Sequence, residues 1–402
     1  MFFGLPKPVW LLGWVSLATD SATEAIYPLL PFFLTRILGA TAVSLGIVEG
    51  AAEAANSVLK ILSGRIADRS ARKRPLVLFG YSVSSLARPL ISVTTSWPQV
   101  FTVRVLDRVG KGVRGAPRDA MLATWATPHT RGKVYGFHRA MDHAGAVIGP
   151  ALASAFLFFF PDQYRMLFAL TIIPGAIAVS LILLVPEEPS SEKRSTGAST
   201  AIRLKPGAID DADGRTAAHQ ALPRAFTSFM LVLTLFTLGN SSDAFLLLKL
   251  TDVAGSVKYV PLMWAALHVV KATTSVVAGS WSDRIGRRTV IALGWLIYAV
   301  VYAAFAVATT LEALVLWFLV YGFYFGFAEG TEKALVADLA PAARRGFAFG
   351  IYNTVQGVGA LAASVVFGAL WSAYGPAAAF GVGAALAITA TALLFVAVKR
   401  QP

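Results

Sequence analysis

Long apolar stretches alternate with short polar connections along the chain. A helix needs about 20 mostly apolar residues to cross a bilayer, and twelve stretches satisfy this requirement. They are expected at approximately residues 9–34, 44–67, 75–94, 98–122, 133–158, 165–186, 226–250, 258–281, 289–308, 311–338, 346–370 and 376–398. The pattern predicts an all-α integral membrane protein with twelve transmembrane helices.

One polar segment divides this pattern into two sets of six helices. Residues 187–225 begin with Pro, Glu and Ser and continue with many charged residues, a composition that favours disorder. We therefore predict an N-terminal six-helix bundle at 1–186, a cytoplasmic linker at 187–225 and a C-terminal six-helix bundle at 226–402.

The two sets of helices share an internal repeat. The sequence G-R-I-A-D-R at 64–69 is matched by G-S-W-S-D-R at 279–284, an offset of 215 residues. The sequence R-G-K-V-Y-G at 131–136 is matched by R-G-F-A-F-G at 345–350, an offset of 214 residues. Two matches at nearly the same offset indicate duplicated halves, and parallel repeats around a central site are a known plan for transporters.

Composition supports a membrane protein and excludes other classes. Hydrophobic residues make up 56% of the chain and charged residues 14%, whereas soluble domains carry about 25% charged residues. The net charge of +13 comes from loops that alternate between rich and poor in Lys and Arg, the positive-inside pattern. The basic loops lie at 65–74, 114–118, 131–133, 193–224, 284–288 and 344–345. We expect both termini in the cytoplasm, a location in the cell (inner) membrane and no binding to nucleic acid.

The first residues and the lack of cysteine exclude further kinds of chemistry and processing. The chain contains no cysteine, which excludes disulfides, thiol catalysis and cysteine metal sites. Its first residues run into an apolar segment without a small-residue cleavage site. We therefore expect the first helix to be uncleaved.

At several motifs the chain resembles the major facilitator superfamily of secondary transporters. The loop pattern G-x-x-x-D-R-x-x-R-R/K of that family occurs twice, with Gly64, Asp68, Arg69, Arg72 and Lys73 in the first copy and Gly279, Asp283, Arg284, Arg287 and Arg288 in the second. The helix pattern G-x-x-x-G-P, typical of antiporters in the family, is matched by Gly145, Gly149 and Pro150. The resemblance covers essentially the whole chain and implies transport by alternating access.

The two loop motifs are interpreted as a cytoplasmic latch. Their glycines permit helix ends to approach closely, and an aspartate at the N-terminus of a neighbouring helix is favoured by the helix dipole. The arginines are expected to pair with carboxylates on adjacent helices while the protein faces outward. The alternative is a topology signal with ordinary snorkelling charges. The pair Gly145 and Gly149 has a similar alternative, in which it serves helix packing without any directional meaning.

The helix at 98–122 departs from the family pattern. Where the family usually has Gln-Gly, this chain has Asp107 and Arg108, and multidrug-efflux-like bacterial members with an acidic residue in this helix look similar. The charged residues of this run are Arg104, Asp107, Arg108, Lys111, Arg114, Arg118 and Asp119. Each charge at membrane depth costs roughly 2.5–3.5 kcal/mol on insertion scales, so the run is a functional hypothesis. Arg114 to Asp119 are expected near the cytoplasmic end.

Charged residues on several helices are predicted to meet near the middle of the membrane. Asp20 and Glu24 share one helix face, and the helix at 44–67 carries a polar stripe that includes Glu53. The proposed proton-coupling residues are Asp20, Glu24, Glu53, Arg104, Asp107 and Arg108. A carboxylate whose arginine partner changes between two states would bind and release a proton. The alternative is a set of static salt bridges, an interpretation that applies equally to Glu49, Lys60, Arg88 and Asp142.

The repeat predicts different roles for the two halves. At the offset of 214, Arg104, Asp107, Arg108 and Lys111 correspond to Phe318, Tyr321, Gly322 and Phe325. The hypothesis is charge handling in the N-terminal half and an aromatic substrate wall in the C-terminal half, with mere packing of the aromatic residues as the alternative. The predicted substrate-cavity residues are Lys111, Asp142, His268, Tyr321 and Phe325.

The first functional hypothesis is a proton-coupled exporter of drug-like compounds or metabolites. The alternatives are an organic-anion or metal-chelate transporter, which would use unpaired bases, and a non-transporting receptor or scaffold. We expect no enzyme, catalytic residue, metal site or cofactor, because neither a nucleophile–base pair nor ligand spacing is present. The sequence G-K-G at 110–112 is not a phosphate-binding loop. The expected partners are the lipid bilayer, a small-molecule substrate and protons, with the protein a monomer.

Overall fold

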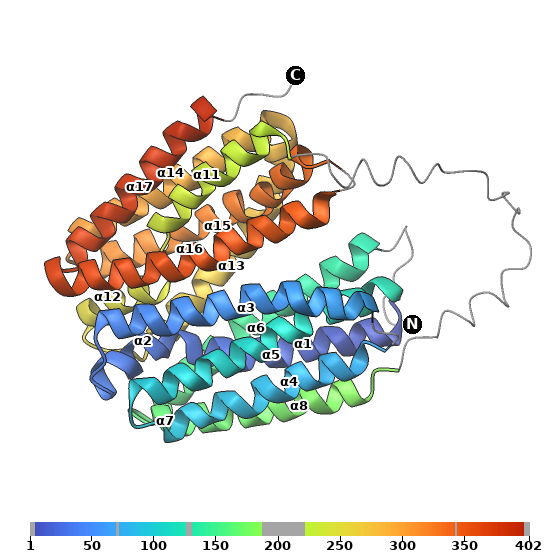
Figure 1. Ribbon diagram of the computed structural model, residues 1–402. Coiled ribbons are helices and arrows are strands. Elements are labelled where there is room, and N and C mark those ends of the chain that lie inside the picture. Colours follow the sequence, from blue (N-terminus) through green and yellow to red (C-terminus); the bar gives the residue numbers. More distant parts are fainter. Residues whose placement is uncertain (1–4, 70–71, 126–130, 187–221, 342–343, 398–402) are drawn as a thin grey trace, which may run out of the picture.

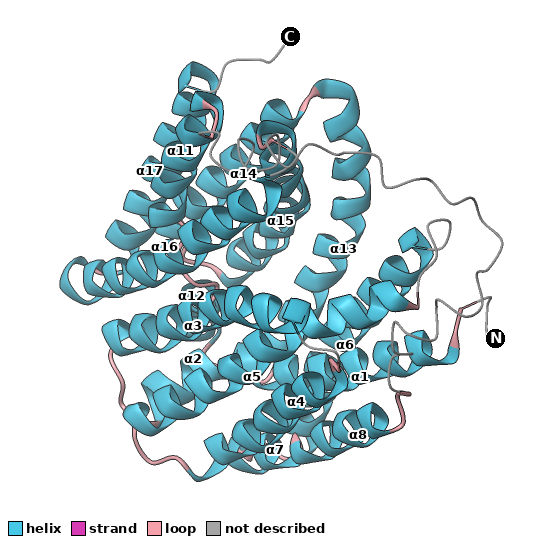
Figure 2. Cartoon of the chain, turned by 45° about the vertical axis from the view of Figure 1, so that its right-hand side comes forward, coloured by secondary structure: helices cyan, strands magenta, loops and turns pink. Residues whose placement is uncertain are grey.

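The computed structural model describes residues 5–69, 72–125, 131–186, 222–341 and 344–397. These residues form helices joined by short loops, and no strand is present among them (Figure 2). The predicted linker at 187–225 lies outside the described residues except for its last four positions, so the predicted domain boundaries remain predictions.

The N-terminal half contains six membrane-crossing units, two of which change helix type along their length and a third of which is interrupted at Thr171. Their bounds are α1 (Lys7–Ile26), η1 (Tyr27–Leu29), α2 (Leu30–Phe32) and η2 (Phe33–Ile37) for the first unit, α3 (Ala42–Arg69), α4 (Arg74–Ala87) with η3 (Arg88–Val93), α5 (Trp97–Thr124), α6 (Arg131–Phe159), and α7 (Tyr164–Leu170) with α8 (Ile172–Leu183).

The C-terminal half repeats this plan. Its units are α11 (Arg224–Gly239) with α12 (Ala244–Ala254), α13 (Val260–Ile285), α14 (Arg287–Val307), α15 (Leu311–Leu339), α16 (Arg345–Tyr374) and α17 (Pro376–Ala397). The described residues therefore form the twelve helical units that the hydrophobic pattern predicted. Figure 1 shows two bundles side by side, with the start of α1 and the end of α17 at the same end of the molecule. We refer to this end as the terminal end and to the opposite end as the far end.

Eight of the twelve units are long and apolar enough to span a membrane by composition alone. The other four contain α1, α3, α5 and α13, and these helices carry most of the charged residues discussed below. Because charges are costly in lipid, such helices are expected to turn their charged faces toward the protein interior.

The first and seventh units, which are equivalent in the repeat, are both interrupted along their length. The first unit changes from α to 3₁₀ geometry at Tyr27, next to Pro28, whose nitrogen carries no hydrogen to donate. The seventh unit is interrupted between Gly239 and Ala244, whereas the sequence predicted one continuous helix at 226–250. Broken helices of this kind frequently mark binding sites in transporters.

The halves contact each other through α3 with α16 and through α6 with α13. Gly46 and Gly50 of α3 lie directly against the backbone of Ser364 and Leu361 of α16, so that a Cβ atom on either glycine would overlap with the facing helix. Small residues permit this close approach of helices, which is a common mode of packing in membranes.

Candidate functional site

The polar contacts that join the halves lie between the centre and the far end. Tyr27 of η1 and Ser242 of the break in the seventh unit are 3.4 Å apart through their hydroxyl oxygens. The hydroxyl of Ser154 donates to the carbonyl of Lys258 at 2.7 Å. Arg36 forms an ion pair with Asp252. These contacts hold the two halves together at the far end.

Charged side chains at the terminal end of the interface are accessible instead. Glu53 and Lys60 on α3 are exposed, and the side chains of Arg139 on α6 and Glu329 on α15 are 68% and 59% exposed. Lys60 lies close enough to Glu329 of the other half to interact electrostatically. The structure therefore combines a closed far end with accessible charges at the terminal end.

At the centre, Glu24 of α1 contacts the opposite half directly. The indole nitrogen of Trp264 on α13 donates to Oε2 of Glu24 at 2.8 Å. Nε2 of His268, one turn further along α13, lies 3.9 Å from the same oxygen. Among the described contacts, Glu24 is thus the one predicted proton-coupling residue whose carboxylate forms a hydrogen bond with the other half.

Next to this contact, an acidic residue that the sequence analysis missed organises the C-terminal half. Asp243 is the last residue of the break between α11 and α12. It accepts a hydrogen bond from the hydroxyl of Tyr321 at 2.8 Å and lies 3.6 Å from Nζ of Lys271. Nζ of Lys271 is also 3.4 Å from the ring centroid of Phe325 and 5.0 Å from that of Trp264. The predicted cavity residues His268, Tyr321 and Phe325 therefore do meet at one place.

The signals for this group were present in the sequence but were weak. The segment G-N-S-S-D at 239–243 contains small and turn-forming residues inside an apolar stretch, which is the pattern expected of a broken helix. Tyr27 and Trp264 have no such signal, because an aromatic residue in a membrane helix is ordinarily a packing residue.

In the N-terminal half, Arg104, Asp107 and Arg108 of α5 are paired within the bundle. Arg104 donates to both oxygens of Glu49 on α3 at 2.8 Å, and Nε of Arg88 donates to Asp107 at 2.9 Å. Arg108 lies 3.6 Å from Asp107. All five side chains are buried. Because Arg104 donates to both carboxylate oxygens of Glu49, the two residues form a buried structural ion pair. Arg104 is therefore not available as an open binding group.

A second polar group lies where α1 packs against α6. Asp142 accepts a hydrogen bond from the hydroxyl of Ser16 and lies 3.6 Å from Nδ1 of His138. Asp20 interacts electrostatically with Asp142 and with Lys111 of α5. This group includes the predicted residues Asp20, Lys111 and Asp142, but it is built from N-terminal helices only.

The glycine motif of α6 brings that helix close to α1. Gly145 lies against the backbone of Leu17, and Gly149 lies against the backbone of Ser21. Pro150 is accommodated inside α6. The close packing expected from this motif is present, while its association with export stays a prediction.

The latch motifs are described only in part. The side chains of Asp68, Arg69 and Asp283, together with the surroundings of Gly279, lie outside the described residues. A Cβ atom placed on Gly64 would lie 3.7 Å from the Cβ of Ala116. Arg72 and Arg284 are exposed. The latch therefore stays a prediction.

The described arginines of the second motif bind within their own half. Nε of Arg287 lies 3.3 Å from Oδ2 of Asp338, near the end of α15. Arg288 donates to the carbonyl of Phe395 in α17 at 2.8 Å. These contacts tie the start of α14 to its neighbours.

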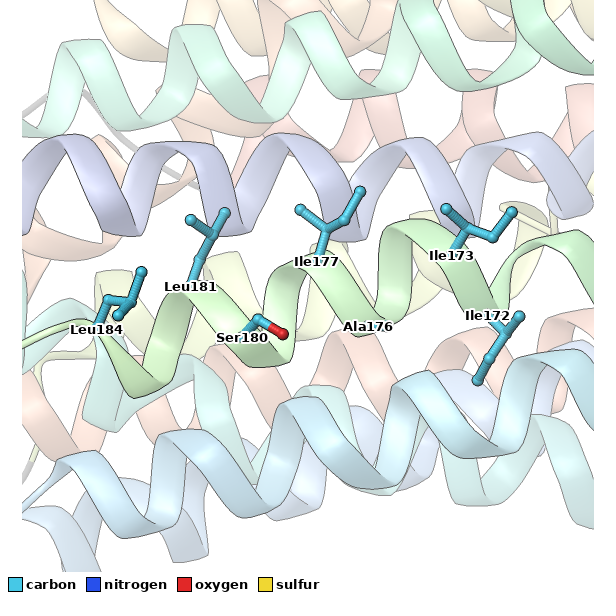
Figure 3. A pocket seen from close by; sticks show the side chains of 7 residues that line it. All are labelled: Ile172, Ile173, Ala176, Ile177, Ser180, Leu181 and Leu184. Atoms are coloured by element: carbon cyan, nitrogen blue, oxygen red, sulfur yellow. The ribbon is translucent and has the colours of Figure 1, made fainter.

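A shallow hollow on α8 is a poor candidate for the site. Figure 3 shows its lining along one helix, namely Ile172, Ile173, Ala176, Ile177, Ser180, Leu181 and Leu184. The lining is almost wholly apolar and Leu184 is 66% exposed. Ligand sites require a few convergent polar groups, which the hollow lacks, and its composition suits contact with lipid chains.

Comparison with known proteins supports the interpretation of the fold. The model of the Major Facilitator Superfamily matches residues 9–270 and 226–402. An uncharacterised MFS-type transporter of Methanocaldococcus jannaschii is 31% identical over 396 residues, covering 97% of this chain and 94% of the relative. Multidrug resistance protein MdtH of Edwardsiella ictaluri is 26% identical over 327 residues, covering 80% of this chain and 76% of the relative.

Solved structures of transporters share the fold. The nucleoside transporter NupG superposes with a TM-score of 0.78 at 15% identity, over 98% of this chain and 100% of that structure. A D-xylose–proton symporter superposes with a TM-score of 0.73 at 16% identity, over 97% of each chain. The chain therefore belongs to the Major Facilitator Superfamily, as a multi-pass membrane transporter of the alternating-access type.

Proposed function

We propose that this protein is a proton-coupled exporter of organic compounds. The observation that carries the proposal is the contact between Glu24 of the N-terminal half and Trp264 of the C-terminal half. A carboxylate at the centre of the molecule, held by a donor on the opposite half, is sensitive to the separation of the halves that alternating access requires.

The physical argument follows from the hydrogen bonds of Glu24. While the halves touch at the centre, the Trp264 indole stabilises the ionised carboxylate and His268 lies 3.9 Å away. When the halves part, Glu24 loses these neighbours, and a charged carboxylate without partners is costly in a medium of low polarity. Protonation removes that charge, so movement of the halves and binding of a proton become linked.

The other predicted coupling residues are proposed to support this step. Asp20 is within electrostatic range of Glu24, and Glu53 accepts a hydrogen bond from Asn56 at 3.1 Å in an exposed position on α3. Arg104, Asp107 and Arg108 form the buried network behind Glu24. We propose that this network holds α3, α4 and α5 in a fixed arrangement while the proton is carried at Glu24.

The substrate is proposed to occupy the aromatic group around Lys271. Tyr321, Phe325 and Trp264 offer ring faces, while Asp243 and Lys271 supply one negative and one positive charge at 3.6 Å. Such a site suits an organic compound with an aromatic or apolar body and a charged group. The similarity to multidrug resistance protein MdtH is consistent with export. The organic-anion alternative gains less support, because Arg104 is engaged by Glu49.

The test is transport in proteoliposomes with an imposed pH gradient of either direction. Ethidium, tetraphenylphosphonium and citrate serve as probes of different charge. We expect a gradient-driven flux of at least one organic cation, and we expect Glu24→Gln to abolish its dependence on the gradient. Glu312→Gln is the matched control, because Glu312 lies in the first turn of α15 at the far end.

The proposal is wrong if transport of every accepted probe is independent of the pH gradient, or if Glu24→Gln responds to the gradient as the unmodified protein does. Citrate as the one transported probe would favour the organic-anion alternative.

A further inference from the structure

A buried carboxylate in the C-terminal half takes no part in the central site. Glu332 on α15 is 2% exposed. Its Oε1 accepts a hydrogen bond from the indole of Trp295 on α14 at 2.9 Å. Its Oε2 accepts bonds from the hydroxyl of Tyr352 and the amide of Gln356, both on α16 and both at 3.1 Å. Three neutral donors from two neighbouring helices thus surround this one acid.

The charged neighbours of Glu332 do not form an ion pair with it among the described residues. Lys333 acts on Glu332 electrostatically, but its ammonium group is bonded to Glu329 at 2.9 Å. The other titratable groups close to Glu332 are Tyr352 and Tyr324. Buried carboxylates are ordinarily paired with a base or a metal, so this environment is unusual.

The internal repeat places different residues at the equivalent positions of the N-terminal half. At the offset of 214, Glu332, Trp295, Tyr352 and Gln356 correspond to Arg118, Tyr81, His138 and Asp142. The correspondence is spatial as well, because Gly80 packs against Arg114 as its counterpart Gly294 packs against Ala328.

The two equivalent groups differ in how the acid is balanced. In the N-terminal half, Asp142 lies 3.6 Å from His138 and within electrostatic range of Arg118. In the C-terminal half, Glu332 occupies the position equivalent to Arg118. Tyr352 and Gln356 occupy the positions equivalent to His138 and Asp142. These positions hold neither the arginine nor the histidine of the N-terminal half, and a proton is a counter-charge that this site can take up.

We propose that Glu332 is a proton-binding site that is linked to the contact between the halves. The proposal rests on the proton-coupled function proposed above and adds a second carboxylate to it. Gln356 directly precedes Gly357 on α16, and Gly357 packs against Ser57 on α3 of the other half. The hydrogen bonds of Glu332 therefore hold the helix that packs against α3 of the other half.

Protonation has a defined consequence for these bonds. An ionised carboxylate accepts from all three donors, whereas a protonated one must donate its own hydrogen. The indole of Trp295 cannot accept it, but the hydroxyl of Tyr352 can turn and accept. The bond between Glu332 and Tyr352 would then reverse, and the Gln356 amide, which lies 3.2 Å from the same hydroxyl, would rearrange. The attachment of α16 to α15 changes as a result.

The first experiment is infrared difference spectroscopy of the purified full chain as the pH is varied between about 5 and 9, the range in which perturbed carboxyl groups titrate. We expect a carbonyl band of a protonated carboxylic acid that is absent in Glu332→Gln and shifted in Tyr352→Phe. Glu312→Gln, which alters an exposed acid in the first turn of the same helix, should keep the band. A band unchanged in Glu332→Gln overturns the proposal.

The second experiment measures the linkage to α3. The chain has no cysteine, so Val58→Cys and Val358→Cys, at exposed positions beside the Ser57–Gly357 contact, can carry spin labels without background. We expect the distance distribution between the labels to change with pH, and to stop changing when Glu332→Gln is added. An identical pH response with and without Glu332→Gln overturns the linkage. Neither readout requires a transported compound, so failure here is distinguishable from failure of the proposed function.

Discussion

The two halves of this protein hold equivalent positions together by different chemistry. In the N-terminal half, Glu49 pairs with Arg104 and Arg88 pairs with Asp107. At the repeat offsets of 215 and 214, the first pair corresponds to Trp264 and Phe318, whose ring centroids are 6.2 Å apart. The second pair corresponds to Tyr302 and Tyr321, at 6.3 Å. Each buried ion pair thus has an aromatic pair as its counterpart.

This difference predicts how the stability of each half responds to single substitutions. A buried ion pair is destabilised strongly when one partner is removed, because the other charge stays behind without compensation. An aromatic pair contributes about 0.5–1.5 kcal/mol beyond its buried area and leaves no charge when it is broken. We therefore expect the N-terminal half to respond more sharply to single substitutions and the C-terminal half to offer adaptable surfaces to a ligand.

The largest effect is expected for Arg104→Met, which leaves the Glu49 carboxylate buried and unpaired. We expect a destabilisation of about 3–5 kcal/mol, seen as a lower thermal unfolding midpoint in detergent and a lower yield of monodisperse protein. The double variant Glu49→Leu with Arg104→Met should recover most of the loss. Equal stability of the single and double variants would contradict the interpretation of this pair.

A smaller effect is expected for Gly50→Ala at the α3–α16 interface. The new Cβ would lie 2.8 Å from Cα of Leu361, and overpacking of this kind costs roughly 1–3 kcal/mol. The repeat places Ala265, which is buried, at the equivalent position of α13. Gly330→Ala is the control, because among the described residues no atom of a neighbouring helix lies within 4 Å of the position that its methyl group would take. Thermal stability that falls equally in both variants would rule out the interface as the cause.

Tyr321→Phe tests the aromatic side of the comparison. It removes the hydroxyl that donates to Asp243 at 2.8 Å, and the loss of a hydrogen bond to a charged group corresponds to about 1.5–3 kcal/mol. We expect binding of ethidium, measured by fluorescence titration, to weaken roughly tenfold to a hundredfold. Tyr374→Phe, at an exposed position at the end of α16, should leave binding unchanged. Equal affinity of Tyr321→Phe and the unmodified protein would remove Asp243 from the proposed substrate site.

The smallest effect is expected for Phe318→Leu, the counterpart of Arg104→Met. The substitution loses the contact with the Trp264 ring but leaves no charge, so we expect about 1 kcal/mol of destabilisation by the same thermal measurement. A loss as large as that of Arg104→Met would show that the two halves do not differ in the way proposed.

Particular residues show which features of the fold and of the candidate site could be predicted from the sequence. The twelve crossings were confirmed, because each depends on local length and polarity. The predicted cavity residues His268, Tyr321 and Phe325 lie around one point, and the repeat had indicated the helix face of Tyr321 and Phe325. Neither Asp243 nor Glu332 was predicted as a site residue, because the position of an acid along the chain gives no indication of the donors that other helices bring to it.

The sequence by itself determined the number of crossings, the duplication and the family-type motifs, all of which follow from composition and spacing along the chain. The tertiary structure alone decided which charges are paired and which are shared between halves. Arg104 donates to Glu49, which lies 55 residues away in the sequence, and Trp264 donates to Glu24, which lies 240 residues away. Such pairings depend on the rotation and close packing of whole helices, which the glycines of α3, α6 and α16 permit and which local pattern does not specify.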